Sequence, residues 1–371
     1  MSNTSKPSLD SIEQAVAAIK AGELIVVVDD DDRENEGDLI MAASQATPEQ
    51  VAFMIRHTSG ILCTPVTEDD ARRLRLDPMV SVNDAPLGTA FTISVDYKHG
   101  LTTGISADER CATIRALAND NSGADEFVRP GHIFPLVARN GGVLMRSGHT
   151  EAAVDLAHMA DLPPVGLLAE LVNDDGTVKR GQALFAFARE HGLKIVSVAD
   201  LIAYRQARER LVARVGAFDL DTEIGPARGY AYETPFDPVQ HVALVYGDIG
   251  DGRGVPARLH REDVVCDVFG GRSLLTSVAK AFAENGRGVL VYLREGTAGV
   301  PAQALAAPDE ARPQTNSEEE RQRRWRDIGL GAQILRDLGI TSIHLLTTAP
   351  RQYIGLTGFG ITIDRTELLE A

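Results

Sequence analysis

A short apolar run followed directly by a crowded acidic segment is the feature that most constrains how this chain can fold. Residues 24–28, Leu-Ile-Val-Val-Val, are rich in β-branched side chains and predict a buried strand. The next ten residues, 29–38, contain seven carboxylates. Carboxylates this crowded repel one another unless a cation neutralises them, and α/β sheets place ligands at strand ends. The pattern predicts a site for Mg²⁺ or Mn²⁺, which prefer oxygen ligands, with a solvated acidic loop as the alternative.

The rest of the chain predicts an α/β protein of two domains, as 371 residues suggest at roughly 100–200 residues per domain. Helical patterns cover residues 11–21, 48–57, 198–215, 274–284 and 330–338. Strand patterns cover residues 23–28, 61–66, 88–95, 134–138, 165–171, 241–246, 288–293 and 342–347. The polar stretch 302–324 predicts a flexible loop. Glycines and a proline after residue 215 place the boundary near 208–220, which divides the chain into domains 1–210 and 211–371.

Charge and composition narrow the partners and the compartment. A net charge of −16 argues against nucleic acid and against an anionic membrane surface as a partner. No apolar run approaches the ~20 residues of a membrane span, and the polar start of the chain lacks a signal peptide's apolar core. The three cysteines, Cys63, Cys111 and Cys266, have no Cys-x-x-Cys spacing, so neither a disulfide framework nor a cysteine-rich zinc site is expected. We therefore expect a cytoplasmic protein.

Three further elements in the first half carry chemistry. Residues 146–150, Arg-Ser-Gly-His-Thr, combine a cation, a glycine, an imidazole and hydroxyls, which suit a phosphate, although a surface turn is the commoner outcome. Residues 129–135, Arg-Pro-Gly-His-Ile-Phe-Pro, predict a turn that holds His132 between two prolines. Glu170 ends an apolar strand pattern, where a carboxylate needs a partner, so it is a candidate for a perturbed pKa.

The order of these elements closely resembles 3,4-dihydroxy-2-butanone 4-phosphate synthase of riboflavin biosynthesis. The resemblance covers about residues 11–208 and rests on Arg-Glu-Asn-Glu-Gly-Asp at 33–38, Arg-Pro-Gly-His at 129–132, Gly-His-Thr-Glu at 148–151 and Glu170. It extends to Arg-His-x-Ser-Gly-Ile at 56–61 and Thr-Thr-Gly-Ile-Ser at 102–106. It implies a domain of mixed sheet with packed helices. It also implies a Mg²⁺-dependent (or Mn²⁺-dependent) conversion of D-ribulose 5-phosphate to formate and 3,4-dihydroxy-2-butanone 4-phosphate.

The resemblance also implies roles for single residues. Glu34 and His149 match metal ligands, and Glu34, Asp38, His132 and Glu170 match catalytic positions. The positions that match substrate contacts are Arg33, Glu34, Asp38, Thr103, Glu170 and the phosphate-binding residues Arg146, Ser147, Gly148, His149 and Thr150. Cys63 matches a pocket-lining position, whereas Leu87 departs from some relatives and is given no role. Synthases of this family are homodimers with sites near the subunit interface, so a homodimer is expected.

The second half resembles GTP cyclohydrolase II over about residues 215–367, without the three cysteines that hold that family's zinc. Asp263 stands where the first cysteine would be, the Cys-x-Cys pair is absent, and Cys266 alone cannot build a thiolate zinc site. We therefore expect no zinc, and a second α/β domain that folds without hydrolysing GTP and has a structural or regulatory role. Arg326, Thr347 and Arg351 still match the family, so a bifunctional enzyme with a non-standard second site is the alternative.

Overall fold

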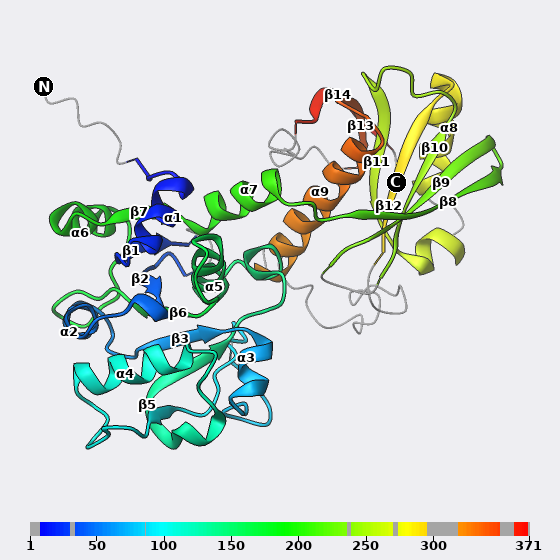
Figure 1. The fold of residues 1–371 in the computed structure, drawn as a ribbon. Coiled ribbons are helices and arrows are strands. Elements are labelled where there is room, and N and C mark those ends of the chain that lie inside the picture. Colours follow the sequence, from blue (N-terminus) through cyan, green and yellow to red (C-terminus); the bar gives the residue numbers. More distant parts are fainter. Residues whose placement is uncertain are drawn as a thin grey trace, which may run out of the picture. The chain divides into compact units, whose positions relative to one another are not determined.

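The chain divides into two compact units, Met1–Tyr204 and Arg205–Ala371, which we describe separately. The computed structural model describes residues 8–29, 34–85, 87–235, 239–269, 274–294, 318–348 and 360–369. Both units are built on a seven-stranded sheet with helices packed against it (Figure 1). The predicted α/β fold class is therefore confirmed.

The first unit contains a mixed sheet in the order β4-β5-β3-β6-β2-β1-β7. Its strands are β1 (Ile25–Val28), β2 (Gly37–Ala42), β3 (Cys63–Val66), β4 (Val95–Tyr97), β5 (Phe127–Val137), β6 (Gly166–Glu170) and β7 (Lys194–Ser197). The pairs β1–β7 and β3–β5 are parallel and the other neighbours antiparallel. Its helices are α1 (Ile12–Lys20), α2 (Pro48–His57), α3 (Glu68–Arg73), α4 (Ala107–Leu117), α5 (His149–Met159), α6 (Gln182–His191) and the start of α7 (Val198–Arg208).

Local sequence signals explain where several of these elements begin. Ser11 and Thr47 cap α1 and α2 in capping boxes that each include a glutamine three residues later, and Pro48 occupies the first turn of α2. All six residues of β2 are buried, because the strand is central and α5 packs against it. This packing brings the first turn of α5 to the residues that lead into β2, which positions the site described below.

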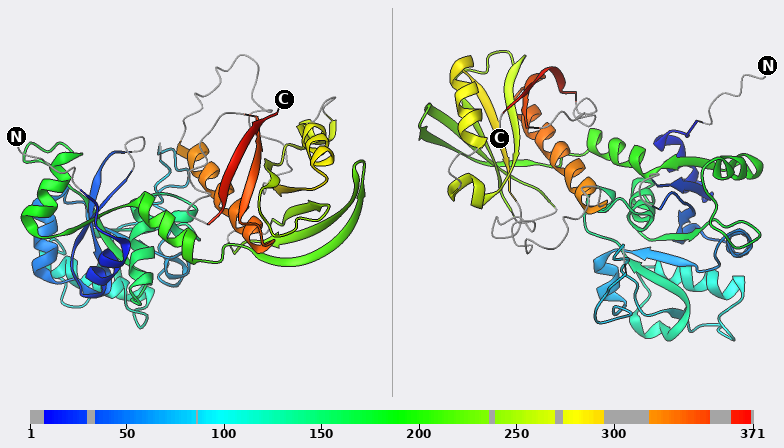
Figure 2. Two further views of the ribbon diagram at one scale, coloured as in Figure 1. Left: turned by 90° about the horizontal axis from the view of Figure 1, so that it is seen from above. Right: turned by 180° about the vertical axis from the view of Figure 1, so that it is seen from behind.

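The second unit contains a sheet in the order β14-β13-β11-β12-β10-β9-β8. Its strands are β8 (Ala213–Thr222), β9 (Gly225–Glu233), β10 (His241–Tyr246), β11 (Val255–Arg261), β12 (Gly288–Leu293), β13 (Ser342–Thr347) and β14 (Thr362–Leu368). Its helices α8 (Leu274–Asn285) and α9 (Glu318–Asp337) pack on opposite faces, as Figure 2 shows. A buried cluster joins α8 to Leu290, whereas Gly331 of α9 packs against Leu259, which points to the other face. No helix in the described ranges is long and apolar enough to span a membrane.

Several predicted elements are wrong in their extent, among them the strand predicted at 134–138, which is the end of a strand that starts at Phe127. Residues 88–94 form only isolated bridges at Phe91 and Thr92, and the strand starts at Val95. The helix predicted to residue 215 ends at Arg208, because Ala213 and the residues after it pair with β9. Helix α9 starts at Glu318, inside the predicted loop 302–324, whose residues 302–317 lie outside the described residues. His132 lies in strand β5 rather than in a turn.

Candidate active site

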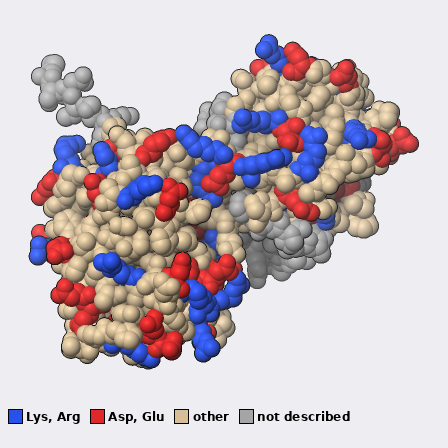
Figure 3. All heavy atoms as spheres, viewed as in Figure 1, with Lys and Arg blue, Asp and Glu red and all other residues tan. Residues whose placement is uncertain are grey.

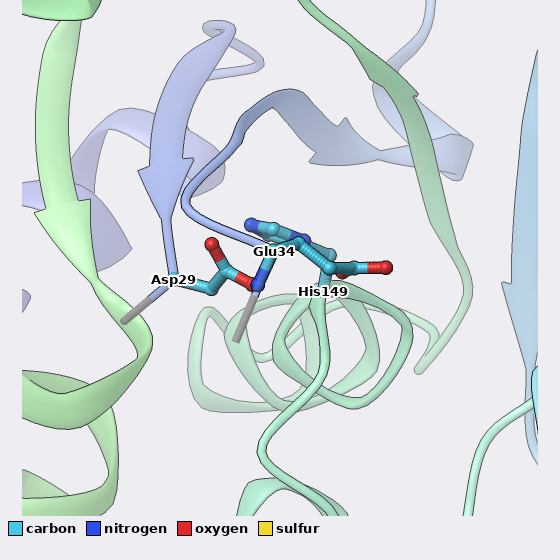
Figure 4. Close-up of side chains that lie close together, drawn as sticks. All are labelled: Asp29, Glu34 and His149. Atoms are coloured by element: carbon cyan, nitrogen blue, oxygen red, sulfur yellow. The ribbon is translucent and has the colours of Figure 1, made fainter. Parts of the chain in front are cut away.

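Three side chains that suit a metal ion meet in the first unit. Asp29 follows β1, Glu34 leads into β2, and His149 is the first residue of α5. Figure 4 shows that they point toward one another, and one ligand atom from each lies within 4.8 Å of the others. Asp29 also contacts the residues that lead into β2, because its carboxylate accepts hydrogen bonds from the backbone of Glu34 (3.1 Å) and Glu36 (2.9 Å). The structure thus brings together the two predicted ligands and adds Asp29, to which the sequence gave no separate role.

Asp38 and Glu170 lie next to this cluster on neighbouring strands. They are directly paired between β2 and β6, and Asp38 is only 3% exposed. Burial, and then the charges of Glu170, Glu34, Asp29 and Glu36, raise the pKa of Asp38 well above its ordinary value. Its Oδ1 is buried without a hydrogen bond to any described residue, and His149 Nδ1 lies 3.8 Å away. This accumulation of carboxylates beside one imidazole fits a divalent cation held by carboxylate oxygens and one imidazole.

Glu170 is held from the segment that precedes β3. The hydroxyl of Ser59 donates to Glu170 Oε2 (2.7 Å), and the Ser59 amide donates to the Glu170 carbonyl (2.9 Å). Cys63 of β3 pairs with Leu168 of β6, the strand that ends in Glu170, and burial raises the pKa of the Cys63 thiol. Cys63 is therefore a neutral thiol that lines the site, and a thiolate nucleophile is not available at this position.

The predicted phosphate-binding residues form the entry to α5. Gly148 is the N-cap, and Ser147, His149 and Thr150 are buried around the first turn, where backbone N–H groups and the helix dipole favour an anion. Arg146 is fixed beside them, because its Nη1 pairs with the buried carboxylate of Glu151 at 2.7 Å. A Cβ atom at Gly148 would meet the guanidinium of Arg146 and the carboxylate of Glu151, so glycine lets this ion pair lie close to the backbone.

His132 and Thr103 belong to a second group. His132 Nδ1 lies 2.7 Å from Asp96 Oδ2, and the His132 amide donates to Asp96 Oδ1 at 2.8 Å. The Asp96 side chain is 4% exposed, whereas that of His132 is 41% exposed and available to a substrate. Gly104, next to Thr103, packs against both side chains and leaves no room for a Cβ atom. Asp96 therefore fixes the orientation of the imidazole.

Buried Arg110 connects the two groups. It donates to the Gly60 carbonyl at 3.3 Å, beside Ser59, and its charge interacts with that of Asp96. Sequence reasoning missed Asp96, and it gave no role to Ser59 or Glu151. Ser59 and Glu151 stand inside motifs that were recognised, whereas Asp96 is a lone acid in a short strand and gives no signal. Arg33 lies outside the described residues.

Family models match both units of the chain. The family model of 3,4-dihydroxy-2-butanone 4-phosphate synthase matches residues 13–204, and that of GTP cyclohydrolase II matches residues 213–367. The bifunctional riboflavin biosynthesis protein RIBA 1 of Arabidopsis thaliana is 48% identical over 96% of this chain and 68% of its own length. The monofunctional riboflavin biosynthesis protein RIBA 2 of the same plant is 46% identical over 95% of this chain and 76% of its own length.

Two solved structures are also similar. RibBX of A. baumannii, a two-domain 3,4-dihydroxy-2-butanone 4-phosphate synthase, superposes with a TM-score of 0.79 and 37% identity, covering 98% of this chain and 100% of its own. A synthase in complex with two magnesium ions covers 54% of this chain and 98% of its own, with a TM-score of 0.53 and 44% identity. The predicted enzyme class is confirmed. The chain belongs to the 3,4-dihydroxy-2-butanone 4-phosphate synthase family of riboflavin biosynthesis, with a second unit of the GTP cyclohydrolase II family.

Proposed function

We propose that the first unit converts D-ribulose 5-phosphate to 3,4-dihydroxy-2-butanone 4-phosphate and formate, with Mg²⁺ or Mn²⁺ held by Asp29, Glu34 and His149. The observation that carries the proposal is the convergence of these three side chains beside the buried pair Asp38 and Glu170. The synthase structure with two magnesium ions supports the choice of metal. When bound, a divalent cation would polarise the substrate's carbonyl and neutralise the enediolate that forms by enolisation.

The chain's own residues supply the remaining functions. The first turn of α5 and Arg146 bind the phosphate and thereby fix the distance from the phosphate to the reacting carbons. Glu170 and Asp38 face the same space and can accept or donate protons in the successive steps of enolisation and rearrangement. His132, oriented by Asp96, is a further group that can carry a proton.

Metal binding is expected to stabilise the first unit. Because the metal would bind the folded site and not the unfolded chain, a hundredfold excess over its Kd should favour the folded state by about 2.7 kcal/mol. For a unit of this size the melting temperature should rise by about 5–10 °C. Thermal unfolding followed with and without Mg²⁺ measures the shift. Glu34→Gln should remove most of it, whereas an unchanged shift in that variant would place the metal elsewhere.

We further propose that the second unit does not hydrolyse GTP and has a structural or regulatory role. At the position of the missing cysteines, the Asp267 carboxylate accepts hydrogen bonds from His260 Nε2 (2.9 Å), Tyr292 Oη (2.6 Å) and the Asp263 amide (3.0 Å). Burial of the phenol, and then its hydrogen bond to the Asp267 carboxylate, raise the pKa of Tyr292. The hydroxyl therefore remains a hydrogen-bond donor. Cys266 is exposed. The imidazole and the carboxylate nearest the missing cysteines are thus engaged in hydrogen bonds with protein groups, and no cysteine pair is present to hold zinc.

The relatives' names leave a bifunctional enzyme as the second candidate. RIBA 1 of Arabidopsis is named bifunctional and RIBA 2 monofunctional. For this chain we expect formate from ribulose 5-phosphate, none from GTP, and less than one-tenth of a zinc ion per chain. Formate assays with both substrates, together with elemental analysis of the purified full chain, check this. GTP turnover that a zinc chelator abolishes would contradict the proposal and establish the bifunctional alternative.

A homodimer is also proposed, and exposed apolar side chains support it. Residues 79–87 carry Met79 (44% exposed), Val80 (53%), Val82 (77%) and Leu87 (38%), an unusual density for a surface segment. Val82→Glu is expected to shift the protein from dimer to monomer in light scattering coupled to gel filtration, because a charge there would be desolvated on association. Val268→Glu, at an exposed valine of the second unit, is the control. A Val82→Glu variant that stays dimeric would remove this segment from the interface. The cytoplasmic location stays a prediction.

A further inference from the structure

A polar cavity of about 370 Å³ lies in the second unit, outside the proposed active site. Its walls are residues 206–210, Val212 and three residues of α9, Gln333, Arg336 and Asp337. This volume falls within the range of small-molecule sites, which is about 300–1,000 Å³. It is distinct from the position of the missing cysteines. That position contacts α9 through Asp327, which binds Arg261 at 2.5 Å, and nine residues separate Asp327 from Arg336, or roughly 13 Å along the helix.

The charges around the cavity are unbalanced in favour of cations. Three arginines line it, Arg208, Arg210 and Arg336, and all three are exposed. The two acids in the wall are already paired with arginines that do not line it. Glu209 binds Arg205 at 2.5 Å, and Asp337 binds Arg214 at 2.6 Å. Arg210 approaches Asp337 only to 3.8 Å, and Arg336 has no ion-pair partner within the described part of the chain.

The wall opposite α9 is held in a fixed position. Gln333 donates from Nε2 to the carbonyls of Gln206 (3.2 Å) and Glu209 (2.7 Å), and its Oε1 accepts from the Leu211 amide (2.6 Å). The side chain thereby fastens residues 206–211 onto α9; this segment, called the link below, leads from the unit boundary at 204/205 into β8. A preorganised backbone with several guanidinium groups around it is the arrangement that recognises phosphate oxygens, because guanidinium groups bind them in pairs of charge-assisted hydrogen bonds.

We propose that this cavity binds a phosphate-bearing small molecule through Arg208, Arg210 and Arg336. The bound anion would join the link at residues 206–211 to α9, and so make the link more rigid. This gives the second unit a ligand site that depends neither on zinc nor on GTP hydrolysis. The shared chemistry is a phosphate or diphosphate group, which either a sugar phosphate or a nucleotide can present.

Limited proteolysis of the full chain tests the proposal. Trypsin cleaves after arginine, and the link region carries Arg205, Arg208, Arg210 and Arg214. In buffer with a metal chelator, saturating pyrophosphate is expected to slow cleavage in this region about fivefold or more, measured by mass spectrometry of the fragments. Ribose 5-phosphate and GTP are then tested in place of pyrophosphate, to distinguish a sugar phosphate from a nucleotide as the ligand. Protection by either compound supports the site.

Three variants make the test specific. Arg336→Gln leaves the cleavage sites in the link intact. It should raise the pyrophosphate concentration that gives half-maximal protection about tenfold, because it removes a charge-assisted contact. Arg253→Gln, an exposed arginine elsewhere in the second unit, should behave like the parent. Arg146→Ala should also keep the protection, which separates this cavity from the proposed phosphate site of the first unit. Absence of saturable protection in the parent, or equal protection in Arg336→Gln, would overturn the proposal.

Discussion

Glu34→Gln is expected to lower the rate of formate release from ribulose 5-phosphate by about 10³-fold or more, with the fold unchanged. The amide has nearly the shape of the carboxylate, and the backbone N–H of residue 34 keeps its hydrogen bond to Asp29. What the change removes is one negative charge and one strong oxygen ligand from the cluster with Asp29 and His149. Steady-state formate assays over a range of Mg²⁺ concentrations measure the effect, and circular dichroism checks the fold.

The matched control is Asp31→Asn, in the same acidic segment. Asp31 lies outside the described residues, and the family resemblance gives it no role, so we expect a loss of less than about tenfold. Equal losses in the two variants would mean that the segment acts through its total charge rather than through one ligand. That outcome would contradict the assignment of Glu34, whatever the absolute size of the loss.

The sequence predicts an element well where the signal is local. Helix α2 has its predicted bounds, Pro48–His57, because a capping box, a proline in the first turn and an apolar face all act within ten residues. Strands β10, β12 and β13 were also predicted with their observed ends, since each is a short run rich in apolar side chains between polar or glycine-containing turns. The acidic residues of segment 33–38 were likewise assigned to the site from local sequence alone, because they directly follow a strand pattern.

Long-range pairing explains what could not be predicted. The helix expected to continue to residue 215 ends at Arg208, because residues from Ala213 pair with β9 and Gln333 of a distant helix binds the link. Asp29 comes close to Glu34 and His149, and so joins the proposed metal site, only once β1 pairs with β2 and α5 packs against β2. His132 was predicted in a turn, but it lies within β5, in an irregular stretch between Val128 and Ile133, the two residues that pair with β4 on either side of it.

Asp96→Asn is expected to lower kcat for formate release by about 10–100-fold with little change in KM. Asp96 is buried, and both of its carboxylate oxygens contact residue 132, one the imidazole and one the amide. An asparagine can keep one of these contacts but can present an N–H group toward Nδ1, which favours the other tautomer of the ring. Asp120→Asn, at an exposed position before β5, is the control and should behave like the parent.

A double-mutant cycle decides whether Asp96 acts through His132. If it only orients the imidazole, His132→Asn should cost about 10²–10⁴ in kcat, and adding Asp96→Asn to it should change little. Effects that multiply fully in the double variant would show that Asp96 acts independently of His132. The buried carboxylate would then stabilise β4 and β5, through Arg110 and the backbone, rather than orient a proton-transfer group.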